Sequence, residues 1–186
     1  APIDPVTLAR ALNAVLPLDV RVAGAEVAAD DFHARFSATG KIYDYQVVNA
    51  PFASPFLRRY VWHVIPPLDL GAMRAASAPL VGEHDFSAFQ GAGSEVPTAV
   101  RRVRRLEWLD PAGAGEPIVM RIEGDGFLRH MVRNLAGTVA QIGLGRWPAG
   151  AGHGILASRT RAHAGTTAPA SGLVLREVLY SHKIQT

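Results

Sequence analysis

Two kinds of hydrophobic pattern are mixed along this sequence. The clearest period-two segment is 41–48, which places Tyr43, Tyr45 and Val47 on one face of a strand. The clearest segment of helical spacing is 127–142. Strand and helix patterns are interspersed without a regular strand–helix–strand alternation. The sequence therefore predicts an α+β fold, with a largely antiparallel sheet flanked by helices.

The remaining elements follow from the same patterns. We expect strands at 20–28, 60–65, 100–109, 118–122 and 173–180, and helices at 5–15 and 70–80. Asp4 is suited to cap the first helix and Pro5 to begin it. The Pro- and Gly-rich stretch 110–117 is expected to be the loop of a hairpin, and 143–154 a further loop.

Length and composition limit the class of protein. The chain has 186 residues, enough for one sizeable core, and no cysteine, which excludes disulfides, thiolate metal sites and cysteine nucleophiles. No apolar run reaches the roughly 18 residues that span a bilayer. The first residues lack the regions of a signal peptide. The absence of cysteine fits the cytoplasm, and we expect a cytoplasmic protein without a membrane partner. Because it does not start with Met, we expect the chain to begin inside a longer reading frame or after processing.

Arginine dominates the cationic side chains. Of 19 cations only Lys41 and Lys183 are lysine, and 16 acidic residues leave a formal charge of +3. The planar guanidinium group suits phosphates and stacks on bases, which favours a nucleic-acid partner. A GC-rich genome produces the same Ala-, Gly- and Arg-rich composition whatever the function, so composition alone leaves both interpretations open.

The most informative stretch is 124–134, GDGFLRHMVRN. We expect Gly126 to open a helix on which Arg129 and Arg133 stand one turn apart, with His130 and Asn134 one position along. Like charges at this spacing cost a few tenths of a kcal/mol, which a helix tolerates readily if the pair faces an anion. The pair indicates an anion-binding face, and the alternative is a solvated helix face.

A second candidate surface combines Arg35, Lys41, Tyr43 and Tyr45, which together suit base stacking and phosphate binding. Taken alone, these residues fit better with a half-buried sheet face in which both tyrosines belong to the core.

Two further motifs receive plainer interpretations. Glu83, His84 and Asp85 are consecutive and cannot all converge on one ion, so no metal site is expected. Ser87 is too close to His84 in the sequence to suggest a catalytic triad. The arginines of 101–105 divide between both faces of a strand, which indicates a solvated or RNA-facing edge rather than a targeting signal.

Six strings of the sequence occur together in order. They are DDFHARFSAT, the K-x-Y-x-Y of 41–45, VGEHDFSAF, GFLRHMVRN, AGTTAPASGL and the closing LxLxxVxY. In this order and at this spacing, from about Ile3 to Tyr180, they resemble the C-terminal portion of the bacterial tRNA pseudouridine synthase A family. The resemblance implies a pseudouridine synthase-like fold.

The resemblance also implies an activity and partners. Members of the family convert uridines 38 to 40 of the tRNA anticodon arm to pseudouridine. The C1′–N1 bond breaks, the base turns over, and C1′ rejoins at C5. No metal or organic cofactor is used. Members are generally homodimers with tRNA lying across both subunits, so tRNA and a second copy are the expected partners.

Three residues match functional positions of the family, and two more lie beside them. Tyr43 matches the tyrosine whose ring packs against the target base, and Leu173 matches the apolar residue that lines the base pocket. Arg133 matches the basic residue that pairs with the catalytic aspartate, where it would keep that carboxylate ionised. Arg129 and His130 neighbour this site and are expected to contact the substrate.

One part of the family pattern is not found in these 186 residues. The family's nucleophile lies in a G-R-T-D-A-G-V-H segment, and this sequence contains no Arg-x-Asp. We therefore expect 1–30 to be the end of an N-terminal subdomain and 31–186 the C-terminal, RNA-binding subdomain.

Two functions follow from that difference. In the first, the chain is part of an active isomerase, inactive alone and completed by a separate N-terminal segment. In the second, it is a catalytically silent module that binds tRNA and dimerises. Loss of a subdomain would expose sheet edges and apolar surface, which favours the first.

Overall fold

A computed structural model describes residues 3–93 and 96–181. The chain divides into two compact units: the smaller combines the residues up to Thr39 with those from Tyr180 onward, and the larger is Gly40–Leu179. The subdomain boundary predicted at residue 30 stays a prediction. Among the described residues, no helix is long and apolar enough to cross a membrane.

The smaller unit contains helix α1 (Pro5–Val15), with the bounds that the sequence predicted. The Asp4 carboxylate accepts a hydrogen bond from the backbone N–H of Thr7 at 3.0 Å and so caps the helix. The strand predicted at 20–28 is wrong, because this segment is extended but unpaired. The side chain of Asn13 forms hydrogen bonds with both the N–H and the C=O of Val22, each at 2.8 Å. These backbone groups of Val22 are therefore not available to pair with a neighbouring strand.

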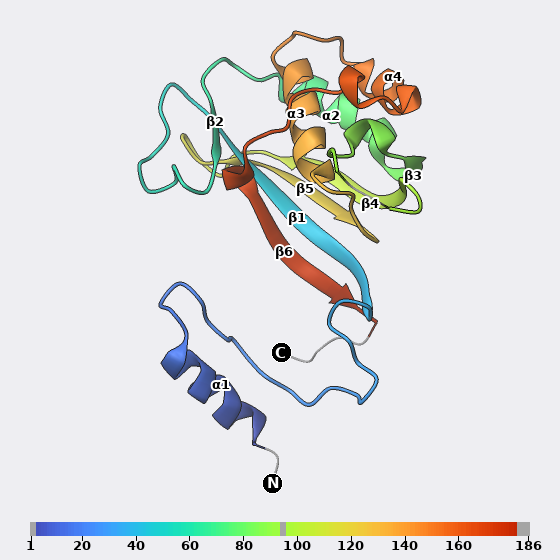
Figure 1. Cartoon of the computed structure of the whole chain (residues 1–186). Helices are drawn as coiled ribbons and strands as arrows, with labels where there is room; N and C mark the ends of the chain where they lie inside the picture. The colour runs from blue at the N-terminus through green and yellow to red at the C-terminus, as the bar shows by residue number, and fades with distance from the viewer. Residues whose placement is uncertain (1–2, 94–95, 182–186) are drawn as a thin grey trace. The chain divides into compact units, whose positions relative to one another are not determined.

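A six-stranded sheet is built around β1 (Figure 1). Its strands are β1 (Ala38–Asn49), β2 (Trp62–Val64), β3 (Gly82–Asp85), β4 (Val100–Leu109), β5 (Ile118–Gly124) and β6 (Leu173–Tyr180). The order is β2-β1-β5-β4-β3, and β6 also pairs with β1. β1 is antiparallel to β5, β5 to β4 and β4 to β3, whereas β1 and β2 are parallel. The predicted α+β fold with a largely antiparallel sheet is confirmed.

The predicted hairpin is also confirmed, with β4 and β5 on either side of the Pro- and Gly-rich loop. Across β1 and β5, Tyr43 pairs with Ile122 and Tyr45 with Met120. This register gathers the apolar residues of both strands on one face of the sheet, because side chains alternate along a strand.

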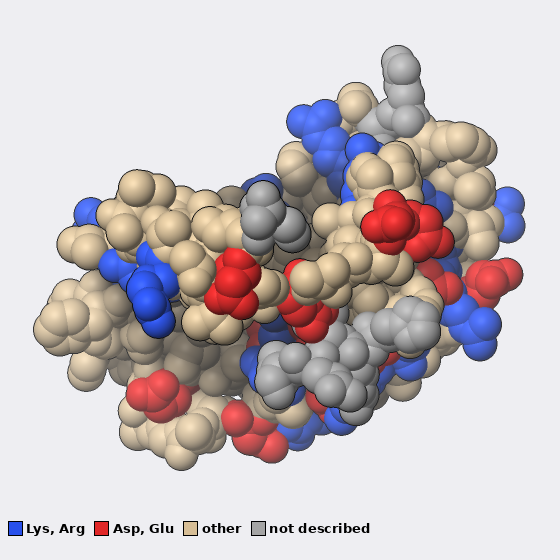
Figure 2. All heavy atoms as spheres, turned by 90° about the horizontal axis from the view of Figure 1, so that it is seen from below, with Lys and Arg blue, Asp and Glu red and all other residues tan. Residues whose placement is uncertain are grey.

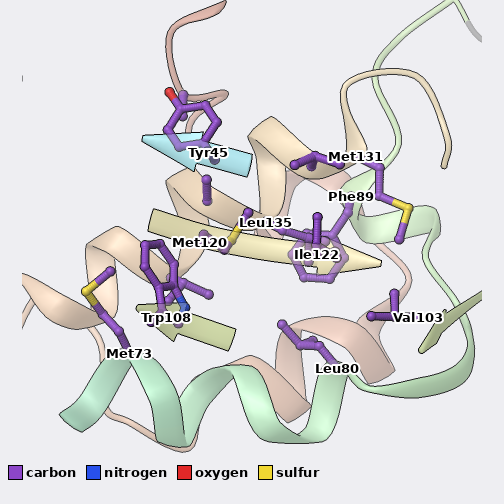
Figure 3. Packing of buried hydrophobic residues seen from close by; sticks show 14 of the residues in the cluster. Tyr45, Met73, Leu80, Phe89, Val103, Trp108, Met120, Ile122, Met131 and Leu135 are labelled. Atoms are coloured by element: carbon purple, nitrogen blue, oxygen red, sulfur yellow. The ribbon is translucent and has the colours of Figure 1, made fainter. Parts of the chain in front are cut away.

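Three helices of the larger unit cover that face: α2 (Leu70–Ser77), α3 (Met131–Gly143) and α4 (Ala151–Ser158). Figure 3 shows Met73 and Leu135, from α2 and α3, packed with Met120 and Trp108 of the sheet. These residues belong to one continuous core, and burying each large apolar side chain contributes about 1.5–3 kcal/mol.

Two sequence predictions about the helices need correction. The helix predicted at 127–142 begins only at Met131, because residues 125–130 form the turn that leads the chain out of β5. The loop predicted at 143–154 is wrong in its second part, where α4 forms. Ile155 and Leu156 of α4 are buried, so tertiary packing stabilises a helix that its glycines disfavour.

Candidate functional site

A cleft of about 310 Å³ opens in the larger unit where β1, the segment leading into α3 and the start of β6 meet. It is lined by Tyr43, Phe127, Leu128, Arg129, His130, Met131, Val132, Arg133, Ala170 and Leu173. All five residues that the sequence suggested are in this set, although they come from three distant parts of the chain. The structure brings them together, and their individual roles stay predictions.

Tyr43 forms one wall of the cleft. Its ring is half-buried and meets Phe127 edge to face, with 5.4 Å between the ring centroids and 87° between the planes. Burial raises the pKa of the Tyr43 phenol, so the side chain is neutral at physiological pH. Its hydroxyl has no hydrogen-bond partner among the described residues. A neutral aromatic ring held in this way suits contact with a planar ligand.

Arg133 is the third residue of α3. Its Nε donates to the carbonyl oxygen of Ala168 at 2.7 Å, and the backbone N–H of Ala168 donates back to the carbonyl of Arg133 at 3.2 Å. Within the described part of the chain, its guanidinium group forms no ion pair. A guanidinium group that is oriented but lacks a counter-ion is suited to a carboxylate or a phosphate.

Arg129 and His130 reach the cleft from a turn and not from a helix, which corrects the predicted one-turn spacing of Arg129 and Arg133. His130 has a left-handed backbone with φ of 59°. Gly91 donates its N–H to the Arg129 carbonyl at 2.8 Å, and a Cβ there would lie 2.9 Å from Nδ1 of His130. Arg129 also donates to the Gly93 carbonyl at 3.2 Å. The turn is thus fixed by a close approach that glycine permits.

The cleft lining carries positive charge and no acidic residue. Withdrawal of the His130 ring from water, followed by the charges of Arg133 and Arg129, lowers the pKa of His130 and keeps the imidazole neutral at pH 7. Apolar walls beside arginines suit an uncharged planar base joined to phosphates. By contrast, the face of the molecule in Figure 2 intersperses Lys and Arg with Asp and Glu.

Asn134 faces the interior and not the cleft, although the sequence grouped it with the anion-binding face. It is fully buried and donates to the Phe89 carbonyl at 2.8 Å. Its Oδ1 accepts hydrogen bonds from Thr167 at 2.6 Å and from Arg161 at 3.2 Å. These bonds hold the segment before β6 against α3. They thereby place the carbonyl of Ala168 where Arg133 reaches it.

The start of β6 is fixed by contacts with β1. The Tyr45 hydroxyl donates to the Pro169 carbonyl at 2.7 Å. A Cβ on Gly172 would lie 2.8 Å from the Gln46 carbonyl oxygen, so only glycine fits. This close packing brings Leu173 into the cleft. It also makes Tyr45 a core residue, as the plainer interpretation of the tyrosine pair predicted.

The remaining motifs are explained by local structure. Asp85 accepts hydrogen bonds from the backbone N–H and hydroxyl of Ser87 at 2.9 and 2.5 Å, which lower the pKa of Asp85. In the part of the chain that the structure describes, no group of three or more His, Cys, Asp or Glu could hold a metal ion. In the basic run of β4, Arg104 pairs with Asp125 at 2.6 Å and Arg105 with Glu107 at 2.7 Å.

Sequence reasoning did not single out Phe127 or Ala170 as lining residues. Both lie inside quoted strings, GFLRHMVRN and AGTTAPASGL, so those strings were the available signal. No sequence pattern predicts the edge-to-face contact of Phe127 with Tyr43, because the two residues are far apart in the sequence.

Comparison with known proteins gives consistent matches. The pattern of the tRNA pseudouridine synthase family matches residues 76–181. The tRNA pseudouridine synthase A of Myxococcus xanthus is 47% identical over 169 residues, which cover 91% of this chain and 63% of that protein. The corresponding proteins of Syntrophotalea carbinolica and Bacillus licheniformis are each 44% identical, over 91% and 92% of this chain and 66% and 68% of their own lengths. The chain thus spans about two thirds of the length of these curated relatives.

Proposed function

Because the chain belongs to the tRNA pseudouridine synthase family, we propose that it forms the tRNA-binding part of an enzyme that isomerises uridines 38 to 40 of the anticodon arm. The observation that carries this proposal is the cleft, in which three residues matched to functional positions of the family, Tyr43, Arg133 and Leu173, meet although they lie far apart in the sequence. Apolar walls beside arginines that form no ion pair with the described residues suit a base that has been turned out of its stack.

Each lining residue has a proposed role. Tyr43 packs against the target base and Leu173 closes the base pocket. Arg133, held by its bond to the Ala168 carbonyl, pairs with the catalytic carboxylate and keeps it ionised. Arg129 and His130 contact the nucleotide from the turn before α3.

The reaction breaks the N1–C1′ bond, forms a C5–C1′ bond, adds a proton to N1 and releases the proton of C5. It needs a carboxylate at the ribose, and no Asp or Glu lines the cleft. We therefore propose that these 186 residues bind tRNA without isomerising it, and that a separate N-terminal segment supplies the carboxylate. The assembled enzyme would be a cytoplasmic homodimer that requires no cofactor.

Binding of unmodified tRNA at increasing salt tests the binding part of this proposal. The chain should bind at 50 mM salt or thereabouts, and its affinity should fall steeply as salt rises. Arg129→Gln should weaken binding by about tenfold, because its proposed charge-assisted contact with the nucleotide is lost. Arg146→Gln is the matched control, since Arg146 is exposed and, among the described residues, its side chain bonds only Gln141. Absence of binding at low salt, or equal effects of the two variants, would contradict the proposal.

A further inference from the structure

The connection between β1 and β2 presents aromatic rings to water. On this loop, residues 50–61, Phe56 is 90% exposed, Phe52 is 79% exposed and Tyr60 is 60% exposed. Single exposed apolar residues are common, but three aromatic rings on one short loop mark a contact surface.

The same loop carries uncompensated positive charge. Arg58 and Arg59 are exposed, and neither guanidinium group bonds another residue of the described part. No acidic residue occurs between Asp44 and Asp69. A partner protein that covered the rings alone would need no such cations. Their presence favours a polyanion with planar groups, because arginine binds phosphate and also stacks on bases.

The rings stand on an ordered turn. The backbone N–H groups of Leu57 and Arg58 both donate to the Ser54 carbonyl, at 3.0 and 3.1 Å, and that of Tyr60 donates to the Leu57 carbonyl at 2.8 Å. At the base of the loop, the His63 ring bonds the Ala50 carbonyl at 2.8 Å. A loop that is already folded loses little conformational entropy when a ligand binds.

The loop also contacts a wall of the cleft. Ser171 lies between Ala170 and Leu173, which line the cleft. Its hydroxyl donates to the carbonyl of Val61, the last residue of the loop, at 3.2 Å. Figure 1 shows this connection next to the start of β6. A nucleic acid whose target base occupies the cleft would thus pass close to the loop.

We propose that loop 50–61 is a second RNA-contact surface. Phe52, Phe56 and Tyr60 stack on unpaired bases that flank the target nucleotide, and Arg58 and Arg59 bind the adjoining phosphates. This inference rests on the proposed function, because it takes tRNA as the ligand. It adds a surface outside the cleft that discriminates unpaired loop nucleotides from duplex.

Affinity for an anticodon stem-loop RNA, and for the matching duplex without its loop, tests the inference. Phe52→Leu with Phe56→Leu keeps apolar area but removes base stacking, and should weaken stem-loop binding about tenfold or more while leaving duplex binding unchanged. Arg58→Gln with Arg59→Gln should lower the slope of log affinity against log salt by about 1–2. Arg21→Gln with Arg146→Gln removes the same charge outside the loop and the cleft, and should change stem-loop affinity by less than about threefold.

The outcomes separate the inference from the proposed function. If wild type binds the stem-loop and both loop variants behave like the control, the loop inference is wrong and the proposed function stands. If wild type does not bind RNA at low salt, the proposed function fails with it. If the phenylalanine variant changes only self-association in sedimentation experiments, the loop is a subunit contact and the inference is overturned.

Discussion

Tyr43 and Tyr45 lie two residues apart on one face of β1, yet their surroundings differ. Tyr45 is fully buried and its hydroxyl is bonded to Pro169. Tyr43 is only half-buried, and its hydroxyl has no bond within the described part of the chain. One ring therefore fixes the segment before β6, and the other remains available to a ligand.

This difference predicts the effect of changing Tyr43. Tyr43→Ala should weaken binding of an anticodon stem-loop by about tenfold, because stacking on an aromatic ring contributes about 1–3 kcal/mol per base. Tyr43→Phe should bind like wild type, because the ring and not the hydroxyl makes the contact. Fluorescence anisotropy titrations of the three proteins, with thermal melts to show that each is folded, check this prediction. Equal losses for the two variants would contradict it.

Asp44 points to the opposite face of the sheet and makes a paired charge cluster. Its two carboxylate oxygens accept hydrogen bonds from Arg121 at 2.8 Å each, and Arg176 lies 3.3 Å away. Burial alone would raise the pKa of Asp44, but the hydrogen bonds and charges of Arg121 and Arg176 lower it below its ordinary value. The ionised form therefore stabilises the fold.

Asp44→Asn should lower the free energy of unfolding at pH 7 by about 2 kcal/mol, because charged hydrogen bonds to Arg121 are lost. A carboxylate with a lowered pKa contributes stability above its unfolded pKa and loses it as pH falls through its folded pKa. The difference between variant and wild type should thus be constant above about pH 5 and shrink below about pH 4. Urea unfolding of both proteins from pH 7 to pH 2.5 measures it. A pH-independent difference would exclude the ion pair as the cause.

At the residue scale, the sequence predicted which side chains meet but not how they are held. Tyr43, Arg133 and Leu173 were found through family-matched strings. The bond from Arg133 to Ala168 joins a side chain to a backbone carbonyl far along the chain. Backbone acceptors carry no sequence signal, so such contacts are visible only in the structure.

At the scale of elements, the position of the segment before β6 depends on close contact with α3. Gly137 of α3 packs against the carbonyl of Thr166, and a Cβ at Gly137 would overlap that carbonyl. Thr138 Oγ1 accepts a hydrogen bond from the N–H of Gly165 at 2.9 Å. The glycines let two backbones approach one another, which sets the distance between Arg133 and Ala168.

Gly137→Ala should therefore destabilise the protein by about 1–3 kcal/mol and weaken tRNA binding, because the added methyl displaces the segment. Gly154→Ala is the matched control: Gly154 lies in α4 with no atom within 4 Å of an added Cβ. That control should be neutral or stabilising by up to about 1 kcal/mol, since alanine favours helix. Denaturant unfolding and binding titrations check both variants. A Gly137 variant as stable as the control would show that the segment adjusts freely.

The two segments with the clearest periodicity, 41–48 and 127–142, were not the ones predicted with the most accurate bounds, because β1 and α3 begin elsewhere. α1, β4 and β6 have the predicted bounds. The strand predicted at 20–28 failed because no neighbouring strand pairs with it, and a strand needs a partner that its own sequence does not encode. α4 was missed because Gly152 and Gly154 disfavour helix, and buried contacts of Ile155 and Leu156 override that preference.

At the scale of the whole molecule, the buried core belongs to the larger unit. Every member of the core cluster lies within 45–168, and none of the described residues from Ile3 to Thr39 is buried. α1 has no buried residue, whereas α3 buries eleven of its thirteen residues. An isolated helix as short as α1 is marginal in water.

Amide hydrogen exchange should reflect this contrast. In the 186-residue chain, the amides of α1 should exchange at least about a hundredfold faster than those of α3, because α1 opens locally and α3 opens only with the core. Exchange followed by mass spectrometry of peptides from both helices measures the rates, and peptides from β5 provide an internal reference for the core. Equal protection of the two helices would show that α1 is buried in solution by a contact such as a second copy.

We propose that these residues supply the tRNA-binding cleft and that a separate segment supplies the catalytic carboxylate. Release of tritium from tRNA labelled at C5 of uridine tests it most directly, because isomerisation frees the C5 hydrogen. The assay is run on the 186-residue chain and on the protein isolated from cells, after its intact mass and N-terminus are determined. We predict that the protein isolated from cells contains an Arg-x-Asp segment and releases tritium. The 186-residue chain should bind the labelled tRNA without releasing tritium. Release by the 186 residues alone would contradict the claim, and an isolated protein that only binds tRNA would be a catalytically silent module.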